Sequence, residues 1–126
     1  MAYVDFIKKY PTVADPTLSV SQRIREALRV LELSPAIKAH AALCYAISIL
    51  EKNPDYRYRV TSHLYPAIAK KLGDGNTASM VERAIRHGIK TIEARKTDGF
   101  KLLFVNPGLT NAELISVLFE TIYFKE

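Results

Sequence analysis

Hydrophobic residues recur at every third or fourth position along most of the chain, which is the spacing of a helix with one apolar face. Between 76 and 90, for example, Val81, Ile85 and Ile89 share one side, while Arg86 and Lys90 lie on the other. The pattern predicts helices at about 19–33, 34–52, 61–72, 76–96 and from 110 onward. A short apolar run at 100–108 is compatible with either a helical turn or a strand. We therefore predict an all-α fold of about six helices without a sheet.

Residues that typically begin and end helices support these boundaries. Ser34 and Pro35 predict the start of the second helix, because serine caps free N–H groups and proline has none to satisfy. The Gly-Asp-Gly segment at 73–75 predicts the end of the third helix. Thr110 and Glu113 have the spacing of a capping box ahead of the last helix.

Length and composition indicate one globular domain, since the 126 residues are 48% hydrophobic and 25% charged. We assign 1–18, which contains two prolines, to an N-terminal arm or short helix, and 19–126 to the helical domain. The single cysteine, Cys44, excludes an intrachain disulfide. No apolar stretch is long enough to cross a bilayer and no export signal is evident. We therefore predict a cytoplasmic protein without a membrane partner.

Positive charge is concentrated in one part of the chain. Residues 57–101 hold ten Lys and Arg residues against four acidic ones, whereas the remaining residues hold eight against nine. The whole excess that gives the chain its net charge of +5 therefore lies in this segment. Such a cluster indicates a polyanionic partner.

The segment 61–96 combines a helix, a glycine-containing turn and a second helix with a basic outer face, which is typical of a helix-turn-helix. In that motif the second helix enters the DNA major groove with its N-terminal residues at the base edges. Arg83 can pair with guanine and Glu82 can accept from the cytosine amine, so we predict that both contact bases. DNA-backbone contacts are predicted for Lys70, Lys71, Asn76, Thr77, Ser79, Arg86 and Lys90.

Two strings within this segment resemble a known family. "LYPAIAKK" at 64–71 and "TASMVERAIRH" at 77–87 are similar to the C-terminal DNA-binding effector domain of the master sporulation response regulator of endospore-forming bacteria. Weaker likeness extends over most of the chain. The resemblance implies a six-helix domain that binds promoter DNA as a tandem dimer and activates or represses transcription. A homodimer and RNA polymerase are further candidate partners. It supports Glu82 and Arg83 as base contacts and places Ser79, Arg86 and His87 near the backbone.

Two departures from the family pattern leave an alternative open. Met80 stands where the family has an arginine, and the turn "LGDGNTAS" is about two residues longer. The alternative is a paralogue that no longer binds DNA and acts by protein contact with a full-length regulator. Because the first sixteen residues are too few for a receiver domain, we also expect an effector without an attached receiver.

Simpler structural roles compete with the predicted site. Glu82 could cap the helix together with Ser79, and the charged face could be solvated only. Gly88 could permit a close helix crossing or be tolerated slack. The last helix is apolar on two sides, and Leu114, Val117 and Phe124 form a possible dimer interface.

Catalytic and metal chemistry have little support in the sequence. His40 and Cys44 lie four residues apart, but two ligands do not make a zinc site. Neither a hydrolytic triad nor a glycine-rich phosphate loop is recognisable. We therefore predict no enzyme activity, no cofactor and no metal.

Overall fold

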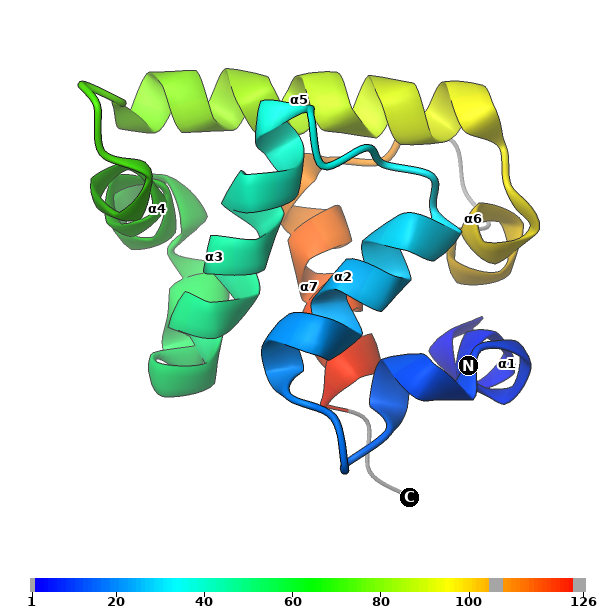
Figure 1. The fold of residues 1–126 in the computed structure, drawn as a ribbon. Helices are drawn as coiled ribbons and strands as arrows, with labels where there is room; N and C mark the ends of the chain where they lie inside the picture. The colour runs from blue at the N-terminus through cyan, green and yellow to red at the C-terminus, as the bar shows by residue number, and fades with distance from the viewer. Residues whose placement is uncertain (1, 105–107, 124–126) are drawn as a thin grey trace.

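The structure is a computed structural model that describes residues 2–104 and 108–123 (Figure 1). Within these residues the secondary structure is helical, with no strand, which confirms the predicted all-α fold. The α-helices are α1 (Ala2–Lys9), α2 (Val20–Val30), α3 (Lys38–Lys52), α4 (Tyr65–Leu72), α5 (Ala78–Arg95), α6 (Asp98–Leu103) and α7 (Asn111–Ile122). Shorter elements are 3-10 helices at Pro11–Ala14 and Pro54–Tyr58 and a π-helix at Val60–Leu64. The first part of the ambiguous run at 100–108 therefore forms α6, while 105–107 lie outside the described residues.

Helix α3 is the centre of the fold. It contacts α2, α4, α5 and α7, and seven of its fifteen residues are buried. Its sequence is apolar nearly all round, as expected for a helix surrounded by others. The longest helix, α5, crosses one side of the molecule, with α4 near its N-terminal end (Figure 1). At the opposite end α1 packs against α6, and Phe6 of α1 is fully buried.

The connection between α2 and α3 is longer than predicted, because α2 ends at Val30 and α3 begins at Lys38. Helix α2 stops where Glu32 adopts a left-handed conformation with φ of 58°. The Leu33 N–H then bonds to the Leu28 carbonyl at 2.9 Å and the Glu32 N–H to the Arg29 carbonyl at 3.0 Å. These are the two bonds of a Schellman motif.

The predicted helix start at Ser34 and Pro35 is wrong by three residues. The Ser34 hydroxyl accepts from the Ala36 N–H at 3.1 Å, and the Ser34 carbonyl accepts from the Ile37 N–H at 3.1 Å. Both bonds close a local turn. Serine offers the same hydroxyl to a turn as to a helix, so its presence does not distinguish the two.

The caps of α2 and α7 differ in completeness. Ser19 and Gln22 form a reciprocal capping box at the start of α2. At α7 the Thr110 hydroxyl accepts from the Glu113 N–H at 3.2 Å, as predicted, but it donates to the Glu113 carboxylate at 3.0 Å. Glu113 therefore bonds to the Thr110 side chain instead of its backbone, and only half of the predicted box is present.

The predicted helix at 61–72 divides into a π-helix and α4. Pro66 occupies the first turn of α4, where its missing N–H costs nothing. Immediately before it, the Leu64 N–H bonds to the Arg59 carbonyl at 3.1 Å and the Tyr65 N–H to the Val60 carbonyl, both five residues back. The wider π turn therefore precedes the proline and joins the 3-10 turn to α4.

Gly88 lies where α5 crosses α3. A Cβ added at Gly88 would lie 2.4 Å from the Cβ of Ala39, which is closer than two such atoms approach in proteins. Gly88 therefore permits a close helix crossing, and the interpretation of tolerated slack is wrong. A larger residue at position 88 or position 39 would push the two helices apart.

We predict that Gly88→Ala destabilises the protein by about 1–3 kcal/mol, because the added methyl group has no space against Ala39. Equilibrium urea unfolding measures the change. The double variant Ala39→Gly with Gly88→Ala moves the methyl group to the other helix and should recover part of the loss. If Gly88→Ala instead stabilises the protein by about 1 kcal/mol, as at an open helical position, the crossing is not close.

Candidate nucleic-acid interface

The helix, turn and helix predicted at 61–96 are present as α4, residues 73–77 and α5. Three consecutive residues of the turn have positive φ: Gly73 at 66°, Asp74 at 53° and Gly75 at 74°. With ψ of −157°, Gly73 occupies a region of backbone space that is essentially restricted to glycine. The sequence "GDG" therefore determines how the chain reverses between the two helices.

Asn76 and Thr77 hold the turn and the start of α5. The Asn76 amide group donates to the Gly73 carbonyl at 2.6 Å, and its oxygen accepts from the Lys38 ammonium group on α3. Thr77 is the N-cap of α5, and its hydroxyl accepts from the Met80 N–H at 3.2 Å. Both side chains, which the sequence suggested as DNA-backbone contacts, thus have structural partners in the free protein.

The outer side of α5 carries a row of exposed residues, which we call the basic face. It consists of Ser79, Met80, Arg83, Arg86, His87 and Lys90. The opposite side is buried through Val81, Ile85, Gly88, Ile89 and Ile92. The structure therefore brings the predicted α5 residues to one exposed side, with Glu82 half-buried at its edge.

Glu82 makes an ion pair along the helix and not a cap. Its carboxylate lies 3.0 Å from the Arg86 guanidinium, one helical turn further on. Because Thr77 is the N-cap, Ser79 lies inside the helix and the proposed Ser79–Glu82 capping box is wrong. Arg86 and Glu82 thus partly neutralise each other on the basic face. Among the described residues, Arg83 has neither an ion pair nor a side-chain hydrogen bond.

Lys70 and Lys71 lie in the last turn of α4 and are both exposed. This places two positive charges directly before the turn that leads into α5. At a helix C-terminus they also face the negative end of the helix dipole. They are therefore available to an anionic partner that contacts both helices.

Arg57 has a structural role, although it contributes to the positive excess of the sequence. Its guanidinium lies 2.6 Å from the Glu120 carboxylate and 5.7 Å from the centroid of the Phe119 ring, both on α7. Its side chain is about one fifth exposed, with a relative accessibility of 22%. The positive charge of Arg57 is therefore balanced by Glu120 within the domain.

Asn111 was not predicted from the sequence, yet it joins both helices of the motif to α7. Its amide group donates to the Glu82 carbonyl at 3.0 Å and to the Tyr65 hydroxyl at 3.1 Å. Tyr65 is buried, and burial raises the pKa of its hydroxyl group. Glu82 and Tyr65 precede Asn111 by 29 and 46 positions in the chain. The residues next to Asn111 therefore do not indicate these contacts.

The possible dimer interface on the last helix is not supported as it was predicted. Leu114 is fully buried in the domain core, so its side chain is not accessible to a second subunit. Val117 is half-buried, and Phe124 lies outside the described residues. Leu114 is buried because α7 contacts α1, α2, α3 and α5, so more than one side of this helix faces the domain.

His40 and Cys44 lie on one side of α3, with 3.8 Å between the thiol sulfur and Nδ1 of the imidazole. Both are half-buried, and burial raises the pKa of the Cys44 thiol. Among residues 2–104 and 108–123, no cluster of three or more His, Cys, Asp or Glu side chains is positioned to hold a metal ion.

A family model described as "Sporulation initiation factor Spo0A C terminal" matches residues 24–122. The chain belongs to this family. The match spans α4, the turn, α5 and most of the core helices. It confirms the resemblance, and with it a DNA-binding effector domain of the sporulation-regulator type. The Spo0A C-terminal family is a family of transcription-factor domains and not an enzyme family.

None of the helices in the described part of the chain is long and apolar enough to span a membrane.

Asn111→Ala should lower the free energy of unfolding by about 1–2 kcal/mol, because it leaves the buried Tyr65 hydroxyl and the Glu82 carbonyl without their partner. Urea unfolding measures this loss. Asn53→Ala is the matched control, since Asn53 follows the end of α3 and its side-chain amide bonds only to the Ile49 carbonyl, four residues back. Equal losses in the two variants would show that Asn111 does not stabilise the packing of the motif.

Proposed function

We propose that this protein is a sequence-specific transcription regulator that places α5 in the major groove of double-stranded DNA. The observation that carries the proposal is the basic face of α5, which is exposed along about three helical turns within a helix-turn-helix. Membership of the Spo0A C-terminal family supports the same function. The turn and Asn111 hold α5 in position against the domain.

Arg83 is the proposed principal base contact. It lies in the second turn of α5, is exposed, and has no ion pair among the described residues. Its guanidinium is therefore available to donate two hydrogen bonds to a guanine. Glu82 is the second proposed base contact. To accept from a cytosine amine, its carboxylate must share or give up its ion pair with Arg86.

The remaining cations of the motif are proposed to contact phosphates. On α5 these are Arg86, His87 and Lys90, which follow Arg83 along the basic face. On α4 they are Lys70 and Lys71 in the last turn. At the start of α5 we propose that a phosphate is bound mainly by Ser79 and by the backbone N–H groups of the first turn, which have no partner within the helix. The side chains of Asn76 and Thr77 contribute indirectly, by fixing the direction of those groups.

Promoter binding as a tandem dimer belongs to the same proposal, as the resemblance at 64–71 and 77–87 implies, and RNA polymerase is a further proposed partner. The second candidate is a domain that acts by protein contact without DNA. Met80, which is 37% exposed on the basic face, favours it, since a thioether offers no charge to a phosphate.

Two cations of the basic face, Arg83 and Lys90, should respond differently to alanine substitution. Arg83→Ala should cost roughly 1–3 kcal/mol on a duplex selected from a random library and should relax the preference at one base pair. Lys90→Ala should weaken binding to selected and random duplexes alike, because a phosphate contact carries no sequence information and Lys90 is not paired with Glu82. Fluorescence anisotropy on both duplexes at one salt concentration measures these effects.

Lys52→Ala is the matched control, since Lys52 is an exposed cation at the end of α3 and outside the motif. It should leave both affinities nearly unchanged. Equal losses for Arg83→Ala on selected and random DNA would contradict base recognition by Arg83. Absence of any duplex binding by the unmodified protein would favour the second candidate.

A further inference from the structure

A hollow of about 580 Å³ lies between α2, the α2–α3 connection, the start of α3 and the C-terminal end of α5. We call it the arginine pocket. Its lining includes Arg25, Arg29, Glu32, Leu33, His40 and Arg95. The volume is within the range of pockets that bind small molecules.

The arginine pocket is separate from the basic face. Counting about 100° per residue, Arg95 lies about 120° to 180° round α5 from Arg83, Lys90 and Arg86, and about 60° to 80° from Met80 and His87 at the near edge of that face. Its other walls come from α2 and from the start of α3, which are not part of the helix-turn-helix. A duplex bound along Arg83, Arg86 and Lys90 would therefore not fill this pocket.

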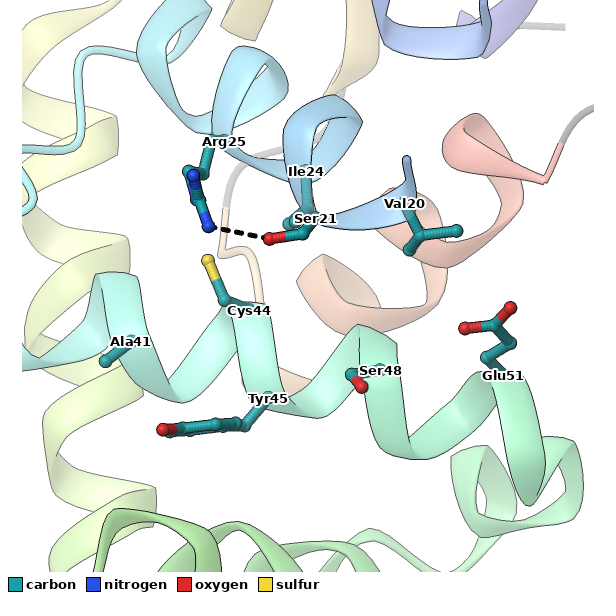
Figure 2. A pocket seen from close by; sticks show the side chains of 9 residues that line it. All are labelled: Val20, Ser21, Ile24, Arg25, Ala41, Cys44, Tyr45, Ser48 and Glu51. Atoms are coloured by element: carbon teal, nitrogen blue, oxygen red, sulfur yellow. Dashed lines mark hydrogen bonds between the residues drawn. The ribbon is translucent and has the colours of Figure 1, made fainter. Parts of the chain in front are cut away.

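Positive charge dominates the pocket lining. Arg29 is paired with Glu26, with 3.0 Å between Nε and the carboxylate. Arg25 donates to the neutral Ser21 hydroxyl at 2.8 Å, and this bond is drawn in Figure 2. Among the described residues Arg95 makes neither an ion pair nor a side-chain hydrogen bond. Two of the three arginines thus lack an acidic partner, against the single carboxylate of Glu32.

His40 lies in the lining of the pocket, within the influence of Arg25. Burial lowers the pKa of its imidazole, and the nearby positive charge of Arg25 lowers it further. The pocket also has an apolar component, because Leu33 is buried in its wall and Pro35 lies beside it. A complementary ligand therefore combines negative charge with an apolar body.

We propose that the arginine pocket binds a small amphipathic acid, meaning a carboxylate, sulfonate or phosphate joined to an apolar group. The acid group contacts Arg25 and Arg95, and the apolar body packs on the exposed Pro35, beside the buried Leu33. Binding is reversible and involves no covalent step. This site goes beyond the proposed DNA-binding function and does not depend on it.

The first test uses the fluorescent sulfonate 8-anilinonaphthalene-1-sulfonate and its uncharged analogue N-phenyl-1-naphthylamine as probes. The sulfonate should bind with one-to-one stoichiometry and at least about tenfold more tightly than the analogue. Equal affinities would overturn the proposal, because they would show that the arginines make no contribution.

The three histidines report where the probe binds, since they lie in different parts of the protein. His40 lines the pocket, His87 lies on the basic face, and His63 lies before α4. In NMR spectra of the unmodified protein, saturating sulfonate should shift the ring signals of His40 and raise the pKa of His40. The ring signals of His63 and His87 should not shift. A shift at His87 or His63 without one at His40 would overturn the proposal.

Variants then test the proposed contact. Arg95→Gln should weaken sulfonate binding about tenfold, whereas Arg95→Lys, which keeps the charge, should retain most of it. Thermal unfolding checks that both variants fold, and the His40 signals in the unmodified protein test the site independently of them. Neither variant should change affinity for duplex DNA.

A neighbouring groove provides the matched control. It has a volume of about 470 Å³, lies between α2 and α3 and is lined by Arg25, Cys44 and Tyr45 among others (Figure 2). Tyr45→Ser alters this groove and leaves the arginine pocket intact, so it should not affect sulfonate binding. If Tyr45→Ser abolishes binding and Arg95→Gln does not, the ligand occupies the groove and the proposal is wrong.

Discussion

The close contact between Gly88 and Ala39 determines where the proposed recognition helix lies. It allows α5 to pack directly on the central helix α3, so that one side of α5 is buried and the other is exposed. The same crossing positions the start of α3, from which Lys38 reaches the helix-turn-helix at Asn76. Asn111 adds a second attachment from α7. The basic face therefore has a fixed direction before any partner binds, which reduces the ordering cost of association.

Ion pairs reduce how much of the positive charge in residues 57–101 is available to a partner. Arg57 is paired with Glu120 and contributes to packing, and Arg86 is paired with Glu82 on the basic face itself. Arg83, Lys90, Lys70 and Lys71 remain exposed without such partners among the described residues. The charge available to DNA is thus smaller than the count of basic residues suggests, but it is concentrated on the two helices of the motif.

Sequence patterns predicted the features that depend on residues close together in the chain, namely the helices and their N-terminal ends. The amphipathic period located α5, and Ser19 and Thr110 mark helix starts through bonds to residues three positions away. At α5 the cap is Thr77 and not the predicted Ser79. Contacts between distant segments were not predictable in this way. The two apolar sides of α7 resemble a free surface until its neighbours are known, which explains the error at Leu114. The side chains of Asn76 and Asn111 are suited equally to DNA and to the backbone carbonyls they contact.

The salt dependence of binding to a short duplex tests the central claim, that the basic face and the end of α4 bind DNA phosphates. Log K plotted against log salt concentration should be linear. If Lys70, Lys71 and Lys90 neutralise phosphates, the slope should be about −2.7 per domain, and about −3.6 if Arg86 leaves Glu82 to contribute. A slope near zero, or no binding at low salt, would contradict the account.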